Sequence, residues 1–308
     1  MPHVTDYYGI PEPVPFLNVD VDHDKPMFVD PRSVRLQAGP APYVDQANHN
    51  TRTFFHEIAR CALSSNAADQ RRGLDLLQHF EEPRETRLGY AAAGFSGHGG
   101  AAEVGTWIWE ALTTELEALL RVGILTQIED LPLFVEGLAE DITSDLTTRI
   151  IFEPLSNFTA SMVAAYPQFT ANGHTTVEVE RQVWDSATLQ WITKEVVLPD
   201  ANGHPLLLVP RDWARPSLLM SAGRYYETKV LGYAQLEQAV VSRDTGRLIK
   251  TPKPQLAQQD GLGRGRGTNL AVTERAQAEN EDLVATFKAY VDNKYEPVPD
   301  DRIEGKLG

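Results

Sequence analysis

The sequence predicts an α+β (or mixed α/β) fold in which several helices flank a small central sheet that includes an antiparallel hairpin. Apolar side chains recur at helical spacing in several segments, for example residues 46–63 and 66–80. The spacing changes to alternation over residues 174–210, which is typical of strands. The 308 residues are 42% hydrophobic and 23% charged, a composition that supports a large buried core. We expect this core to be a single domain over residues 16–241.

The N-terminal part is predicted to contain little helix. Residues 1–15 are acidic and rich in proline, and they predict an extended, weakly ordered arm with no signal peptide. Two short apolar pieces with strand character follow, at 16–21 and 27–29. Between them, three aspartates would share one face of a strand: Asp20, Asp22 and Asp24. The glycine turn and distal glutamate of a calcium-binding loop are missing, which favours a solvated edge or turn.

A glycine-rich turn precedes the next helix, which is expected around residues 101–121. The turn ends the stretch ETRLGYAAAGFSGHGG, residues 85–100, and lacks the lysine and Ser/Thr of a phosphate-binding P-loop. Its glycine spacing also differs from the GxSxG elbow of serine hydrolases. A glycine loop that opens a helix still presents free amides to an anion. His98 lies in this turn and is a candidate catalytic residue.

Carboxylates gather between an apolar run and a long helical pattern. LPLFVEG, residues 131–137, predicts a short buried strand, and Thr143 or Ser144 is expected to cap a helix that Pro154 kinks or splits. Asp145 in the first turn would then favour the helix dipole. The helix dipole does not explain Glu136 and Asp141. Together with Asp145 they are the candidate metal ligands.

The second half of the core predicts a hairpin and more helix. The alternating pattern implies two strands with a turn near Asp185–Thr188, and PLLLVP, residues 205–210, predicts a third, more buried strand. Residues 223–241 are helical in pattern. Residues 270–295 predict a C-terminal helix packed on the core, and residues 296–308 a polar tail.

Residues 242–269 are the one basic stretch in an acidic chain. They are rich in Gly, Pro and Gln, which predicts a flexible segment. Such a segment is either a solvated linker or a contact for nucleic acid or an acidic partner, and it lacks aromatic residues for base stacking. The residues assigned to this contact are Arg247, Lys250, Lys253, Arg264 and Arg266.

Charge and composition exclude several classes of protein. The net charge of −15 repels phosphates at long range, so the chain is not a general polyanion binder. The only cysteine, Cys61, excludes an internal disulfide and cysteine-rich zinc sites. No apolar run is long enough to span a membrane. We therefore expect a cytoplasmic, bacterial protein.

The order of acids and bases follows the general layout of metal-dependent nucleases of the PD-(D/E)xK superfamily. In that chemistry carboxylates hold Mg²⁺ or Mn²⁺, and a basic residue orients or stabilises the reacting groups. Glu85 or Glu110 would be the helical acid, Glu136, Asp141 or Asp145 the central one, and Lys194 or Arg211 the basic residue. This sequence departs from the (D/E)xK motif of that superfamily. In the motif the lysine follows an acid by two positions, whereas Lys194 precedes Glu195.

Three segments resemble an uncharacterised bacterial family associated with phage-defence and mobile-element loci. They are ETRLGYAAAGFSGHGG, FVEGLAEDITSDLTTRII and LLLVPRDW, and the resemblance extends over residues 16–295. It implies a nuclease effector or a subunit of a defence complex, and it assigns no catalytic residue.

Three functions therefore stand as hypotheses. The first is a metal-dependent nuclease, or nuclease-like subunit of a defence system, that acts through the carboxylate cluster. The second is a non-catalytic subunit that docks a protein partner through residues 242–269. The third is a metal-dependent hydrolase of a small molecule, which would use His98 with the acids of 136–145.

Overall fold

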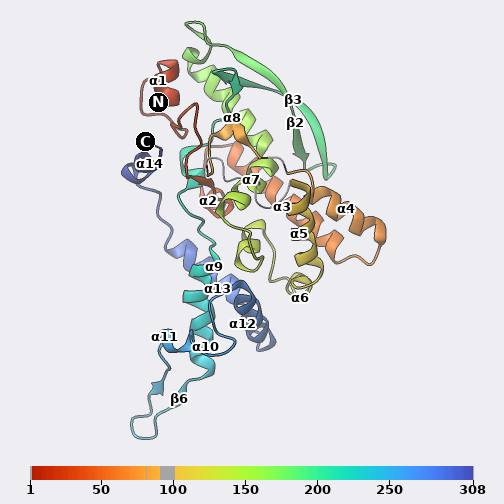
Figure 1. Cartoon of the computed structure of the whole chain (residues 1–308), viewed down its shortest axis with the longest axis vertical. Helices are drawn as coiled ribbons and strands as arrows, with labels where there is room; N and C mark the ends of the chain where they lie inside the picture. Colours follow the sequence, from red (N-terminus) through yellow and green to blue (C-terminus); the bar gives the residue numbers. More distant parts are fainter. Residues whose placement is uncertain (1, 81, 91–100, 308) are drawn as a thin grey trace.

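The computed structural model describes residues 2–80, 82–90 and 101–307. It confirms the predicted α+β class, because helices predominate and the strands form three small antiparallel sheets. The molecule is elongated, with a broad body at one end and a narrower, mostly helical extension that carries a hairpin at its far tip (Figure 1). Within the described residues, no helix is long and apolar enough to cross a membrane.

The N-terminal residues are packed and partly helical, which corrects the expectation of an extended arm. The first elements are α1 (Val4–Tyr8), β1 (Phe28–Val29) and α2 (Pro31–Leu36). Val4 and Tyr8 are buried, and the Tyr8 hydroxyl donates a hydrogen bond to the Asp200 carbonyl at 2.8 Å. The apolar side chains of α1 thus find partners far away in the chain, which the local proline content does not reveal.

Helices form one side of the body, largely as the apolar spacing predicts. They are α3 (Tyr43–Ala62), α4 (Ala67–Leu77), α5 (Ala101–Thr113) and α6 (Glu117–Arg121), so the helix expected over 101–121 is divided in two. Close approach of α4 and α5 depends on glycine. A Cβ on Gly105 would lie 2.0 Å from the Leu77 carbonyl oxygen, where no side chain fits.

The stretch LPLFVEG is not a strand. Residues Ile128–Leu133 form the 3₁₀ turn η2, with a capping box between Gln127 and Asp130. Pro132 has no N–H group for a strand ladder, which is consistent with a turn. The segment is buried because helices surround it, and this burial produced the strand-like apolar pattern.

The long helical pattern becomes two helices, α7 (Glu140–Ile150) and α8 (Phe152–Ala165). The predicted split is confirmed, and Pro154 lies in the first turn of α8, where its missing N–H group costs nothing. The predicted cap at Thr143 or Ser144 is wrong, because α7 begins at Glu140. Asp145 therefore lies in the second turn, and the dipole does not explain it.

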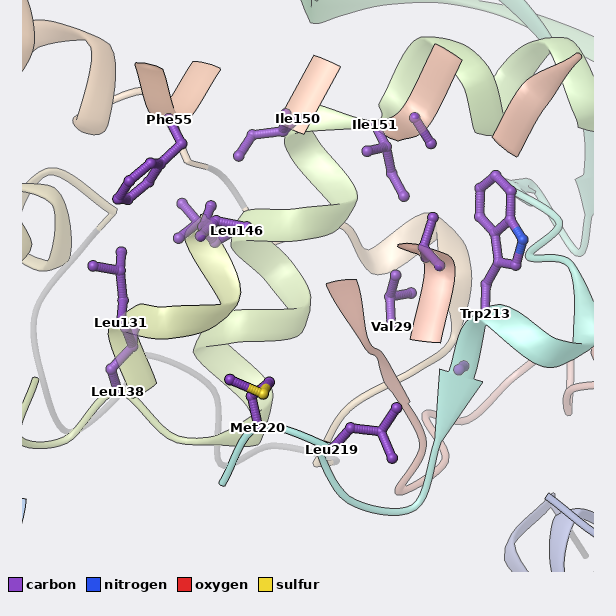
Figure 2. Packing of buried hydrophobic residues seen from close by; sticks show 14 of the residues in the cluster. Val29, Phe55, Leu131, Leu138, Leu146, Ile150, Ile151, Trp213, Leu219 and Met220 are labelled. Atoms are coloured by element: carbon purple, nitrogen blue, oxygen red, sulfur yellow. The ribbon is translucent and has the colours of Figure 1, made fainter. Parts of the chain in front are cut away.

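Helix α7 runs through the middle of the body. Leu146 and Ile150 of α7, and Ile151 directly after it, belong to a buried cluster with Val29 and Phe55 (Figure 2). Full burial of one such aliphatic side chain contributes roughly 1.5–3 kcal/mol. These contacts fix the rotation of α7 about its axis, and this rotation determines where its polar residues point.

The predicted hairpin is confirmed, although the strands of the described residues form three separate small sheets and no single central one. Strand β2 (Thr176–Asp185) pairs antiparallel with β3 (Gln190–Ala201), which pairs with β4 (His204–Pro205). Strand β5 (Ala214–Arg215) pairs instead with β1. The short turns η3 (Pro167–Thr170) and η4 (Arg211–Trp213) precede β2 and β5, and η1 (Arg84–Thr86) lies between α4 and α5.

Residues 206–209 are buried but lie outside the strands, so the predicted third strand is wrong. The Leu208 amide donates its hydrogen bond to the Thr159 hydroxyl at 3.0 Å, and the Leu207 amide to the Glu85 carbonyl at 2.8 Å. Partners on two different segments satisfy this backbone, so it forms no ladder.

The extension comprises most of the rest of the chain. Its elements are α9 (Ala222–Tyr225), the π-helical turn η5 (Tyr226–Val230), α10 (Leu231–Glu237), β6 (Val240–Val241), β7 (Leu248–Ile249), α11 (Lys253–Leu256), α12 (Arg266–Ala278) and α13 (Leu283–Asn293). After α13 the chain returns to the body, where it forms α14 (Asp300–Leu307) (Figure 1).

These elements correct three expectations about the C-terminal region. Residues 242–269 contain β7, α11 and the start of α12, residues 270–295 hold the rest of α12 and all of α13, and residues 296–308 include α14 with Ile303 and Leu307 buried. Helix α14 lies beside α1, and the His3 ring is 2.9 Å from the Leu307 carbonyl (Figure 1). The polar tail thus folds because two apolar residues of α14 reach the body.

A buried ion pair joins the extension to the body. Lys288 of α13 contacts Asp130 of η2 at 2.9 Å. Burial raises the pKa of Asp130 to about 6, although Lys288 opposes this shift. Such pairs add little net stability when intact, but removing one partner is costly.

Candidate functional site

Three charged residues form a stripe along one face of α7. Asp141, Asp145 and Arg149 follow one another at intervals of four residues, so their side chains stack along the helix. Asp145 and Arg149 are both buried. Charged side chains are seldom buried unless a partner or a function offsets the cost, which makes this stripe the first candidate for a site.

Two segments from the first third of the chain face this stripe. The Lys25 amide donates to the Arg87 carbonyl at 3.0 Å, and the Gly89 amide donates to the Lys25 carbonyl at 2.9 Å. This parallel bridge holds the loop that contains Asp24 beside residues 82–90. As a result, Asp24 and Glu82 lie close enough to act electrostatically on α7.

Gly89 leaves the space that the Asp141 carboxylate occupies. The Tyr90 amide donates to Asp141 Oδ1 at 3.3 Å. A Cβ built on Gly89 would lie 2.7 Å from the same oxygen, and the φ of Gly89 is +120°. Only glycine combines this backbone conformation with room for the carboxylate.

The negative charges of several neighbouring acids act on Asp145. Burial raises its pKa to about 8, and the negative charges of Asp141, Glu82 and Asp24 add to this shift while Arg149 opposes it. Burial also raises the pKa of Asp141 and of Asp24. A group of acids in this state is stabilised by a bound proton or by a cation.

A cavity of about 470 Å³ adjoins the acids and is rich in arginine. Arg149 reaches it from the far end of the α7 stripe, where its Nη2 donates to the Glu82 carbonyl at 2.9 Å. Five basic side chains and two acidic ones line the cavity, which we call the arginine pocket: Arg84, Arg87, Arg149, Arg181 and His204, with Glu82 and Glu85.

The structure separates the acids that the sequence grouped together. Asp141 and Asp145 lie in one cluster. Glu85 is buried in the arginine pocket, where Arg181 Nε is 2.5 Å and Arg149 Nη2 3.6 Å from its carboxylate oxygens. Glu136 projects outward with 80% of its side chain exposed, 3.7 Å from Arg266.

The remaining candidates lie elsewhere or outside the described residues. Lys194 pairs with Glu153, and Arg211 pairs with Asp300 at 2.5 Å. The charges that act most strongly on Asp145 include neither of these cations. His98 lies outside the described residues, so the small-molecule hydrolase that depends on it stays a prediction.

The basic residues of 242–269 divide into two groups. Arg247 and Lys250 are exposed on or beside the β6–β7 hairpin. Lys253 donates to the Glu227 carbonyl, and Arg264 pairs with the Glu227 carboxylate at 3.1 Å. Arg266 donates to the carbonyls of two residues of the body, Pro132 and Leu138.

Sequence patterns did not indicate the arginines of the site or Glu82. The spacing of Asp141, Asp145 and Arg149 was a usable signal for the stripe, since it follows the helical period. No local signal connects Glu82, Arg84 or Arg87 with α7. Within residues 2–80, 82–90 and 101–307, no group of three His, Cys, Asp or Glu side chains is arranged to hold a metal ion by itself.

The fold and site define an α+β domain with two neighbouring acids, the half-buried Asp141 and the buried Asp145, beside an arginine pocket. Residues 10–221 match the family described as a domain of unknown function, DUF8370, and the chain belongs to this family. The matched region includes α7, residues 82–90 and the arginine pocket, whereas the extension beyond residue 221 lies outside it. Searches of curated proteins and of solved structures return no significant match.

Proposed function

We propose that this protein is a metal-dependent nuclease in which Asp141 and Asp145 hold Mg²⁺ or Mn²⁺ and the arginine pocket binds the phosphate backbone of the substrate. The observation that carries this proposal is the α7 stripe. It begins with two acids of the cluster and ends with Arg149 in the arginine pocket. A cation site and an anion site thus adjoin one another, as hydrolysis of a phosphodiester requires.

Two carboxylates are sufficient for this metal. Mg²⁺ keeps several of its waters and is usually bound by one or two carboxylates together with substrate phosphates. A complete protein cage is therefore not expected at this site. Asp24 and Glu82 add negative charge around the pair, which favours a divalent cation over a monovalent one.

The arginine pocket supplies the complementary charge. Guanidinium groups bind phosphate oxygens in pairs of parallel hydrogen bonds. A chain with a net charge of −15 repels nucleic acid at long range, so a local group of arginines is needed to bring the backbone to the acids. Water then attacks phosphorus, its proton passes to a carboxylate or to solvent, and one P–O bond of the backbone breaks.

The biological setting is part of the same proposal. The resemblance of residues 85–100, 134–151 and 206–213 to a family of phage-defence and mobile-element loci supports a role as an effector or subunit of a bacterial defence complex. A cytoplasmic location is consistent with that role.

The test is cleavage of DNA and RNA by the purified protein with Mg²⁺ or Mn²⁺. We expect cleavage that EDTA abolishes and a loss of about a hundredfold or more in Asp141→Asn and Asp145→Asn. Glu115→Gln, which alters an exposed acid on the body, is the matched control and should cleave as the wild type does. Unchanged cleavage in both Asp variants, or no metal-dependent cleavage of any nucleic acid, would overturn the proposal.

A further inference from the structure

The β6–β7 hairpin lies at the tip of the extension (Figure 1). It exposes apolar side chains on both of its faces. Val240, Val241, Leu248 and Ile249 are 60%, 64%, 56% and 57% exposed. Neighbouring residues of a strand point to opposite faces, so each face of this hairpin carries apolar side chains. Leu236 at the end of α10 is also exposed and lies close by in sequence.

This exposure is unlike that of the body. The body shows exposed large apolar residues only singly, as at Val122, whereas here five of them gather within a short stretch of the described chain. Single exposed apolar residues are ordinary, but a contiguous group marks an interaction site. Two paired strands are also marginally stable by themselves, which favours completion by a further strand.

The hairpin has free edges for such a strand. In the part of the chain that the structure describes, β6 pairs only with β7, so the outer edge of each strand has no strand partner. Backbone N–H and C=O groups at an open edge are a template for strand addition.

Side-chain hydrogen bonds hold the base of the hairpin against the rest of the extension. The Gln235 side chain donates to the Thr251 carbonyl at 2.7 Å, and Gln238 donates to Gln259 at 2.7 Å. These bonds fix the two ends of the hairpin against α10 and the segment after α11. The hairpin is therefore presented to solvent from a structured base.

Charge indicates the kind of partner. Residues 240–250 contain three basic side chains, Arg243, Arg247 and Lys250, and one acid, Asp244, while the whole chain carries −15. An acidic partner complements this local charge, and the same hairpin of a second copy would be repelled. Residues 240–250 contain no aromatic residue, which disfavours the stacking that single-stranded nucleic acid requires.

We propose that the β6–β7 hairpin docks a different protein, and that the recognised segment is an extended strand in which acidic and β-branched side chains alternate. The strand adds to an open edge of the hairpin, its apolar side chains cover one face, and its carboxylates meet the basic residues. The hairpin lies outside the family domain of residues 10–221, so this docking surface is an addition to that domain.

The probe is a fluorescently labelled peptide of alternating valine and glutamate, compared with the same peptide carrying lysine in place of glutamate. We expect the full chain to bind the glutamate peptide at least about tenfold more tightly, with affinity that falls as salt is added. The double substitution Val241→Ser and Leu248→Ser should weaken this binding about tenfold. Val122→Ser, an equally exposed apolar residue on the body, is the control and should bind normally.

Several outcomes would overturn the proposal. These are equal binding of the two peptides, binding that the double substitution does not change, and no binding of either peptide. Hairpin-dependent dimers in light scattering would assign the surface to a second copy. Hairpin-dependent binding to single-stranded DNA or to anionic phosphatidylserine vesicles, without peptide binding, would assign it to those partners. Nucleic-acid cleavage should be the same in the double variant, so the two proposals can fail separately.

Discussion

Asp145 and Arg149 lie one turn apart on α7, and both are buried. The guanidinium lowers the pKa of Asp145, but burial and the neighbouring acids outweigh it and hold the pKa near 8. Arg149 also donates to the Glu82 carbonyl and contacts Glu85 in the arginine pocket. It therefore connects the acid cluster with the cavity beside it.

Stability should depend on pH through Asp145 when no metal is present. Because its folded pKa of about 8 exceeds the ordinary value of 3.8, the folded state keeps a proton that the unfolded state loses between these values. The contribution of Asp145 to stability is therefore fully present below about pH 4 and falls as pH rises towards 8, by up to about 1.4 kcal/mol per pH unit.

The variant Asp145→Asn replaces the titrating carboxyl group with a neutral amide, so it isolates the contribution of Asp145 to the pH dependence of stability. In EDTA, denaturant unfolding should show it to be more stable than the wild type at pH 8, with the difference shrinking towards pH 4. Glu115→Gln should follow the wild-type curve. Parallel curves for the wild type and Asp145→Asn would contradict the raised pKa.

Gly89→Ala should displace the Asp141 carboxylate. The new Cβ would meet Oδ1 at 2.7 Å, and the φ of +120° adds backbone strain. We expect nucleic-acid cleavage to fall about tenfold or more, because misplaced catalytic groups are costly. Gly123→Ala is the control, since its φ is +74° but nothing lies within 4 Å. Equal losses of cleavage in the two variants would mean that strain alone is responsible.

Arg84→Ala should weaken nucleic-acid binding with little effect on folding. Arg84 lines the arginine pocket, and its exposed side chain pairs with Glu82 at 3.0 Å. Losing one phosphate contact should reduce the dependence of log Kd on log salt by about one unit. Arg71→Ala, on the exposed side of α4, should leave that slope unchanged. An unchanged slope in Arg84→Ala would remove this residue from the phosphate site.

Lys288→Met should destabilise the junction between the body and the extension. It leaves Asp130 buried without its cation, and loss of one partner from a buried pair costs about 3–5 kcal/mol. Adding Asp130→Asn should recover part of the free energy of unfolding, as a double-mutant cycle would show. Lys306→Met on the exposed face of α14 is the control. A loss no larger than that of the control would show that the pair does not support the junction.

Apolar spacing predicted helices and strands correctly where the backbone geometry of the element alone sets which of its side chains are buried. The apolar spacing of residues 46–63 predicted α3, and alternation predicted β2 and β3, because each pattern follows directly from backbone geometry. The same reasoning failed for LPLFVEG and for residues 206–209. Both segments are apolar because neighbours enclose them, and neither takes part in the strand ladder that continuous burial suggested.

The sequence by itself determined the fold class, the β2–β3 hairpin and a helix that contains Asp145, whereas the structure extended this helix to include Asp141. Only the tertiary structure decided which charges meet them. Asp24 and Glu82 reach α7 through the bridge between Lys25 and residues 87–89, while Glu136, much nearer in sequence, turns away to Arg266. Electrostatic interaction depends on distance through space and on burial, and the spacing of residues along the chain encodes neither.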